Sequence, residues 1–384
     1  METAKRIYLP PVSLIGPGAL KELKNDLQSS NYKKVLLVTD KVLVTIGIAG
    51  KVEEILKDSN LDYIIYDEVK QNPTKENVKK GLLIYQQNSC DCIITLGGGS
   101  PQDCGKAIGI LATNGGNIED YEGVNISKKK SAPLIAINTT AGTASEITIN
   151  YVITDEERKV KMVMVDKNCL VDIAVNDPLL MLNMPAALTA ATGMDALTHA
   201  IEAYVAVGAF DWSDNLALHA IALIGQSLRD AVHDGQNIEA RNKMAWAQFT
   251  AGQAFSNCGL GYVHSMAHQL GGTYDLPHGV CNAILLPVVE EFNAPVCGDK
   301  FRNIAEALGV NTSGMTREEA NKAAINAIKK LSADVGIPAG LKELGVKESD
   351  FELMAKNALL DVCAGGNPKP VSLEDTIAIF KAAY

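Results

Sequence analysis

Residues 92–114 have the sequence CIITLGGGSPQDCGKAIGILATN, and this stretch decides the class of fold. A short run rich in β-branched residues passes through three glycines into an apolar run of helical length. A strand that turns directly into a helix is the repeating unit of a parallel sheet covered by helices. Ser100 and Asp103 have the spacing of a helix-capping pair, and Pro101 suits the first helical position. The stretch therefore predicts a strand, a glycine turn and a helix that Ser100 caps.

The same alternation of strand and helix surrounds this unit. Strands are predicted at 35–40, 62–69, 90–96 and 132–140, and helices at 52–60, 76–88 and 101–114. Because these strands are apolar on both faces, we expect a Rossmann-like, mostly parallel sheet with helices on both sides. Residues 147–166 alternate around a polar turn and predict a β-hairpin.

The strand signal fades after residue 184, and helical periodicity replaces it. A long helix is predicted to open at Pro185, and further helical runs lie at 215–228, 241–255, 300–309, 317–336, 348–362 and 373–384. A chain of 384 residues is too long for one hydrophobic core. We therefore expect an α/β domain at residues 1–184 and an all-helical domain at 185–384.

The composition excludes several classes of partner. The formal net charge is -10, and the only cationic run is the short SKKKS at 127–131, which argues against nucleic acid and anionic membranes. No apolar run approaches the roughly 20 residues of a membrane span, and the N-terminus lacks the apolar segment of a secretory signal. Eight cysteines without a C-x-x-C motif indicate free thiols in a reducing compartment. We expect a cytoplasmic protein.

The turn Gly97-Gly98-Gly99-Ser100 is a candidate phosphate site. Glycines before a helix allow the backbone to approach a phosphate, which exposed N–H groups and the helix dipole attract. A purely structural turn is the alternative, because the G-x-G-x-x-G pattern is absent. Asp40 ends an earlier strand, where a carboxylate can bind a ribose 2′-hydroxyl and repel a 2′-phosphate, which favours NAD over NADP. The alternative is an ordinary aspartate that starts the following helix.

A second loop of small residues follows the strand at 132–140. Its hydroxyls and accessible backbone suit the riboses of a dinucleotide, and the candidate residues are Thr139, Thr140, Thr143 and Ser145. These two loops and Asp40 lie at the carboxyl ends of predicted parallel strands, where such sheets bind ligands. The sequence therefore predicts an NAD site there.

All six histidines lie within residues 195–279. Asp195 and His199 are separated by i, i+4 in a helical run, so their side chains leave one face of the helix. His264 and His268 repeat this spacing, and His278 follows in a Pro-His-Gly turn. Neutral imidazoles that share a face can point lone pairs at one ion. These residues predict a metal site from three separate parts of the chain.

Three observations limit this cluster. His219 lies in an apolar helical pattern and His233 at a predicted helix end, so both are set aside. Ser265 follows His264 where a zinc protease of the H-E-x-x-H type has its glutamate, so a hydrolase loses its main support. A four-coordinate site containing Asp195 needs only three imidazoles, so one of the remaining four histidines can be non-ligating.

Longer motifs occur in a fixed order, namely GGGSPQDCGKA, NTTAGTASE, NDPLL, ATGMDALTHAIEAY, GYVHSMAHQLGG and PHGVCNAILLP. With them the sequence resembles the iron-dependent (group III) alcohol dehydrogenase family over essentially the whole chain. The resemblance implies an NAD-binding α/β domain and a helical, dehydroquinate synthase-like domain, with a metal in the cleft between them. It also implies Fe²⁺, with Zn²⁺ or another divalent metal as alternatives, and a homodimer.

The resemblance also assigns roles to residues. The metal ligands would be Asp195, His199, His264 and His278, and His268 would be the catalytic imidazole near substrate and nicotinamide. The cofactor contacts would extend beyond the two loops to Asn72, Lys161 and Leu179. The alcohol pocket would be lined by Asn150, Phe255 and Cys363.

The substrate class follows from shorter similarities. The stretches ITINYVITDEE, FSNCGLGYVH and DVCAGGNPKPVSLED are most similar to lactaldehyde reductases, which favours lactaldehyde and 1,2-propanediol as aldehyde and alcohol. NTTAGTASE and GYVHSMAHQLGG are equally similar to 1,3-propanediol and short-chain alcohol dehydrogenases. The family's LLPHV motif is altered at Val288, where its histidine is missing.

Two hypotheses from other functional classes remain. A lyase of the dehydroquinate synthase kind would need a basic pocket for an acidic substrate, whereas the neighbours of the histidines are apolar or neutral. A non-catalytic NAD sensor would tolerate loss of metal ligands, yet all four are present. In the dehydrogenase, the metal would act as a Lewis acid during hydride transfer, and His268 would pass a proton to solvent.

Overall fold

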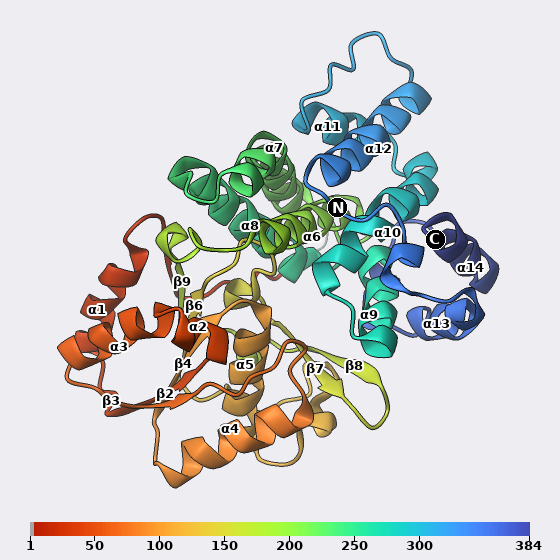
Figure 1. Ribbon diagram of the computed structural model, residues 1–384. Coiled ribbons are helices and arrows are strands. Elements are labelled where there is room, and N and C mark those ends of the chain that lie inside the picture. The colour runs from red at the N-terminus through yellow and green to blue at the C-terminus, as the bar shows by residue number, and fades with distance from the viewer. Residues whose placement is uncertain (1–3) are drawn as a thin grey trace. The chain divides into compact units, whose positions relative to one another are not determined.

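The computed structural model describes residues 4–384, which form two compact units (Figure 1). The first unit ends at Met181, and Ala141–Thr143 group with the second unit, Leu182–Tyr384. The predicted boundary between residues 184 and 185 lies close to this division in the sequence.

A six-stranded sheet is the centre of the first unit. Every pair of neighbouring strands is parallel, which confirms the predicted sheet. In the order of the sheet the strands are β1 (Val12–Ile15), β9 (Ile173–Asn176), β6 (Leu134–Asn138), β4 (Cys92–Gly97), β2 (Lys34–Val38) and β3 (Asp62–Tyr66). The sequence did not predict β1 and β9, each of which has only four residues.

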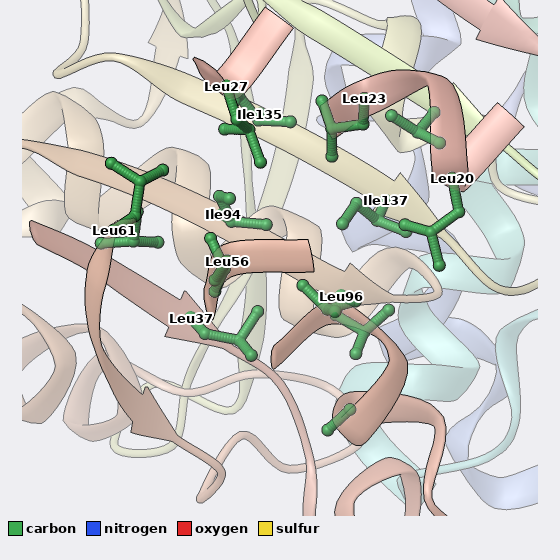
Figure 2. Close-up of a cluster of buried hydrophobic side chains, with 14 of the residues drawn as sticks. Leu20, Leu23, Leu27, Leu37, Leu56, Leu61, Ile94, Leu96, Ile135 and Ile137 are labelled. Carbon is green, nitrogen blue, oxygen red and sulfur yellow. The ribbon is translucent and has the colours of Figure 1, made fainter. Parts of the chain in front are cut away.

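Helices cover both faces of this sheet. They are α1 (Ala19–Ser29), α2 (Lys41–Thr45), α3 (Ile48–Asp58), α4 (Lys75–Gln87) and α5 (Gly99–Asn114). Leu23 of α1 and Leu56 of α3 join Leu37 and Ile94 of the strands in one buried cluster (Figure 2). On the opposite face α5 lies close to β4, because a Cβ added at Gly105 would be 2.1 Å from Thr95 Cγ2.

A second, small sheet completes the first unit. Strands β7 (Asn150–Asp155) and β8 (Val160–Val165) pair antiparallel, which confirms the predicted hairpin. Strand β5 (Gly123–Val124) pairs with β8. Short 3-10 helices connect these elements: η1 (Ile118–Tyr121), η2 (Ser145–Ile147), η3 (Lys167–Cys169) and η4 (Pro178–Leu180).

The second unit is helical throughout Leu182–Tyr384, as the periodicity predicted. Its α-helices are α6 (Ala186–Val205), α7 (Asp211–His233), α8 (Ile238–Cys258), α9 (Tyr262–Tyr274), α10 (His278–Asn293), α11 (Lys300–Ala307), α12 (Arg317–Asp334), α13 (Phe351–Ala358) and α14 (Leu373–Ala382). The 3-10 helices are η5 (Ala294–Val296), η6 (Leu341–Leu344), η7 (Glu348–Asp350) and η8 (Val362–Gly366). Most of α6 is buried on every side, which makes it the central helix of this unit.

Two predictions from composition can be compared with the structure. All eight cysteines are free, as their spacing predicted. Across residues 4–384, no helix is long and apolar enough to cross a membrane.

Candidate functional site

The four side chains predicted as metal ligands converge within the second unit. On α6, the Oδ2 of Asp195 lies 4.0 Å from the Nδ1 of His199. The Oδ1 of Asp195 lies 4.0 Å from the Nε2 of His264 on α9 and 3.6 Å from the Nε2 of His278, the first residue of α10. Three segments separated by up to 83 positions thus share one site (278 − 195 = 83).

The start of α10 is held against α6 by a close backbone approach. A Cβ at Gly279 would lie 2.3 Å from the carbonyl oxygen of Ala191, so only glycine fits there. Pro277 precedes the helix with the extended backbone that favours a helix start. This packing places His278 beside Asp195, one turn further along α6 than Ala191.

Burial determines the charge of two of the imidazoles. It lowers the pKa of both His199 and His264 to about 4, against the opposing attraction of Asp195. Both rings are therefore neutral at pH 7 and carry a lone pair. The buried Nδ1 of His199 has no hydrogen-bond partner within residues 4–384. A buried acceptor without a donor is costly, and a cation would satisfy it.

Ligand atoms of Asp195, His199 and His264 all lie within 4.8 Å of one another, and His278 joins them through its contact with Asp195, so these residues fit a divalent metal. Ligand atoms about 2.1 Å from one tetrahedral ion lie about 3.4 Å apart, close to the 3.6 and 4.0 Å that separate Asp195 from the imidazoles. One carboxylate and three imidazoles, without a thiolate, form a donor set that suits Fe²⁺ or Zn²⁺.

Glu202 contacts the predicted ligand His264 and was not predicted from the sequence. Its Oε2 lies 2.5 Å from the Nδ1 of His264, and its Oε1 accepts from the backbone N–H of Val263 at 2.6 Å. The carboxylate therefore orients His264 with Nε2 toward Asp195 and also caps the first turn of α9. Burial raises the pKa of Glu202 to about 7, although backbone N–H groups oppose the shift. Glu202 lies seven residues after Asp195 and therefore on the same face of α6, so the sequence spacing could have identified it as a neighbour of the ligands.

Asn282 is a second missed residue. It lies one turn after His278 on α10 and is completely buried. Its Nδ2 donates to the Oδ1 of Asp195 at 2.7 Å and lies 3.2 Å from the Nε2 of His264. The same nitrogen is 3.1 Å from the Nε2 of His278. Asn282 therefore contacts three of the four predicted ligands and positions the carboxylate.

His268 belongs to a different group of side chains. Its Nδ1 lies 2.8 Å from the Oδ2 of Asp361, and ligand-type atoms of His268, Asp361 and Cys363 all lie within 4.8 Å of one another. The ring stacks on His278, with centroids 5.5 Å apart. The His268 ring therefore lies beside the predicted ligand His278, in contact with Asp361.

The two residues predicted for the alcohol pocket in this unit lie near the histidines. Phe255 stacks on His199, with centroids 4.2 Å apart. Cys363 follows Asp361 in η8, and burial raises the pKa of its thiol well above the usual range. The third pocket residue, Asn150, begins β7 in the first unit, where its carbonyl accepts from the buried Lys106 at 2.7 Å.

In the first unit, the glycine turn meets the second small-residue loop at the carboxyl ends of β4 and β6. The N–H of Thr139 donates to the carbonyl of Gly97 at 3.1 Å, and a Cβ at Gly98 would lie 2.9 Å from Thr140 Cγ2. A side chain at position 98 would therefore require Thr140 to shift. The two loops predicted for NAD therefore contact each other.

The predicted cap at Ser100 is wrong. Helix α5 begins at Gly99 with Gly98 as its N-cap, so Ser100 and Pro101 lie inside the first turn. Asp103 accepts instead from the hydroxyl of Ser145 at 2.7 Å and from the N–H of Val152 at 3.0 Å. Asp103 thus bonds to residues distant in the sequence and does not take part in a helix cap. No side chain caps the N–H groups in the first turn of α5.

The remaining residues predicted to bind the cofactor lie on different elements and have different contacts. Asp40 accepts from the N–H of Leu43 at 3.0 Å and caps α2, which is the alternative role of a strand-end aspartate. Lys161 on β8 donates to Asn72 at 2.8 Å. Leu179 lies in η4 with 39% of its surface exposed. Thr143 groups with the second unit.

The chain resembles known proteins along its whole length. Residues 10–178 match the family described as iron-containing alcohol dehydrogenase, and residues 189–384 match the Fe-containing alcohol dehydrogenase family, C-terminal. A 1,3-propanediol dehydrogenase of Klebsiella pneumoniae is 48% identical, with 98% of each chain covered. The lactaldehyde reductase of Escherichia coli K12 is 46% identical, with 99% of this chain and 100% of the other covered.

Two further matches complete the comparison. An NAD-dependent methanol dehydrogenase of Bacillus methanolicus is 46% identical, with 98% of this chain and 99% of the relative covered. The crystal structure of a 1,3-propanediol oxidoreductase superimposes with a TM-score of 0.97 at 47% identity, with 100% of both chains covered. Matches of this extent, together with the two family matches, establish that this chain belongs to the iron-containing alcohol dehydrogenase family.

Proposed function

We propose that this chain is an NAD-dependent, Fe²⁺-dependent oxidoreductase that interconverts a small primary alcohol or diol and its aldehyde. The preferred pair is 1,2-propanediol and lactaldehyde. The convergence of Asp195 with three imidazoles is the observation that carries the proposal. The proposal includes a homodimer in the cytoplasm.

In this proposal, Asp195, His199, His264 and His278 hold the metal. A divalent ion bound there supplies a Lewis acid for the oxygen of the alcohol or aldehyde. Glu202 and Asn282 keep His264 and Asp195 in the orientations that ligation needs.

NAD is proposed to bind at the carboxyl ends of the parallel strands. The glycine turn with the uncapped start of α5 suits the pyrophosphate, and the loop at Thr139 and Thr140 suits a ribose. Asp40 uses its Oδ1 to cap α2, and a carboxylate at this position disfavours the extra phosphate of NADP. A nicotinamide cofactor held by these residues would supply the hydride acceptor and donor.

His268 is proposed to move the proton. Oxidation of a primary alcohol removes one hydride from carbon and one proton from oxygen, so the site needs a proton acceptor besides the hydride acceptor. The ring lies beside the ligand His278, and in this proposal it is not itself a ligand. In the reduction of the aldehyde, His268 would donate the proton to the oxygen.

The substrate assignment draws on side chains of the second unit. Phe255 and Cys363 lie near the histidines and would limit the substrate to a small one. 1,3-Propanediol is the second candidate, because the Klebsiella relative with that activity in its name is 48% identical. Discrimination between such small groups amounts to only about 1–3 kcal/mol.

The test is an anaerobic assay of the purified protein after reconstitution with Fe²⁺. NADH and NADPH oxidation are followed over lactaldehyde, 3-hydroxypropanal, acetaldehyde and butanal, with metal content measured on the same samples. We expect the highest kcat/KM with lactaldehyde and a strong preference for NADH. Equal rates with the two cofactors would contradict the role of Asp40, and a higher kcat/KM for 3-hydroxypropanal would favour the second candidate.

A further inference from the structure

Asp361 holds the imidazole of His268 from the side of η8. It is the N-cap of η8, and its side chain is 6% exposed. One oxygen, Oδ1, accepts from the N–H of Cys363 at 2.9 Å, and the other, Oδ2, lies 2.8 Å from the Nδ1 of His268. Both carboxylate oxygens therefore have a defined partner, and the two partners lie on different elements.

The chemistry of this contact determines the tautomer of His268. Burial alone would raise the pKa of Asp361, but His268 and the hydrogen bonds outweigh it, so the pKa lies below its usual range. An ionised carboxylate can only accept hydrogen bonds. The hydrogen of the neutral imidazole must therefore sit on Nδ1, and Nε2 carries the lone pair.

Two neighbouring rings restrict the orientation further. The His268 ring is nearly parallel to His278, at an interplanar angle of 14°, and meets His264 edge-on at 71°. A ring flip would move Nδ1 away from Asp361 and leave a buried carboxylate oxygen without its donor, which is costly. Packing and hydrogen bonding thus select the same orientation.

We propose that Asp361 is a positioning residue for His268, which it holds in the single orientation and tautomer that keeps Nε2 as the proton acceptor. The inference rests on the proposed function, in which His268 takes the proton of the alcohol. In that step the O–H bond breaks, a new N–H bond forms at Nε2, and the Nδ1–H bond to Asp361 persists. Asp361 itself touches no substrate in this assignment.

Asp361→Asn is the sharpest test, because it preserves the shape of the side chain. Its Oδ1 can still accept from the N–H of Cys363, while its NH₂ group now donates toward Nδ1 of His268. The hydrogen of the ring must then move to Nε2, which abolishes the acceptor. We expect kcat to fall by about 100-fold with KM little changed, the range that general acid–base catalysis contributes.

A matched control exists in the first unit. Asp166 caps η3 through the N–H of Asn168 at 2.9 Å, and its other oxygen accepts from the N–H of Ser127 at 2.8 Å. Asp166→Asn makes the same chemical change at a similar buried cap without a histidine partner. We expect kcat to be unchanged there, so an equal loss in both variants would overturn the specific role of Asp361.

A double variant separates this inference from the proposed function. If Asp361 acts through His268, Asp361→Asn causes no additional loss of kcat in the His268→Ala background. A kcat unaffected by His268→Ala would refute the proton role in the proposed function. A large loss in His268→Ala together with full activity of Asp361→Asn would overturn the inference alone.

A spectroscopic measurement tests the inference independently of the catalytic rate. In the zinc-loaded protein with ¹⁵N-labelled histidine, the nitrogen shifts of His268 should report hydrogen on Nδ1 in the wild type and on Nε2 in Asp361→Asn. The same tautomer in both proteins would overturn the inference. Asp361→Ser, which keeps a capping hydroxyl but is too short to reach the ring, should lose the fixed tautomer and serves if the asparagine variant does not fold.

Discussion

Replacement of Glu202 by glutamine should weaken metal binding without unfolding the protein. The carboxylate contacts the Nδ1 of His264 at 2.5 Å and accepts from backbone N–H groups at the start of α9, among them those of Val263 and His264 at 2.6 and 3.4 Å. A glutamine has only one accepting oxygen, so its NH₂ group must face either the imidazole or the start of α9. If it faces Nδ1, the ring hydrogen moves to Nε2 and the ligand loses its lone pair.

The magnitude follows from the bond that is lost. At pH 8, above the pKa of about 7 of Glu202, the carboxylate is mostly ionised, and a hydrogen bond to a charged group contributes about 1.5–3 kcal/mol, which corresponds to about 10- to 100-fold in a binding constant. Loss of an outer partner of a metal-ligating histidine typically has the same effect on metal affinity. We therefore expect the Kd for Zn²⁺ or Fe²⁺ to increase by about 10- to 100-fold in Glu202→Gln.

The assay is a competition between the metal-free protein and a chromophoric chelator, with the melting temperature measured in parallel. Glu290→Gln is the control, because Glu290 is a buried glutamate of α10 that accepts a hydrogen bond from the Nδ2 of Asn293 at 3.3 Å. It should leave the metal affinity unchanged. A Glu202→Gln protein that binds metal as tightly as the wild type would show that the carboxylate does not orient His264.

Three further predictions concern other residues of the two units. His264→Ala should abolish stoichiometric metal binding, measured by elemental analysis after dialysis, and a full complement of metal would contradict the ligand assignment. Asp40→Ala should increase the kcat/KM ratio of NADPH to NADH and also destabilise the protein by about 1 kcal/mol, because it removes the cap of α2, as kinetics and chemical denaturation can show. Burial, then the charge of Glu202, raises the pKa of Glu290 to about 8, so the folded state keeps a proton that the unfolded state releases near 4.5. The contribution of Glu290 to stability is therefore complete below pH 4.5 and is lost as the pH rises to about 8, by at most about 1.4 kcal/mol per pH unit. Glu290→Gln should remove this part of the pH dependence of the free energy of unfolding, which chemical denaturation at several pH values can measure.

Long periodic segments could be predicted from the sequence, whereas short strands could not. The helical pattern after Pro185 and the apolar strands of the first half correspond to observed elements, because their side-chain period is a local property. Strands β1 and β9 have four residues each and become strands only through pairing, β9 with β6 and β1 with β9. Four residues contain too little periodicity to identify a strand without its neighbours.

The sequence by itself determined the two-part architecture and the pairs at i, i+4, because helix geometry places Asp195 with His199 and His264 with His268 on common faces. Only the tertiary structure decided which groups surround those residues. Glu202 meets His264 over 62 positions, Asn282 meets Asp195 over 87, and Asp361 meets His268 over 93. The physical reason is that a hydrogen bond between distant residues depends on how helices pack, and no local period of the sequence contains that information.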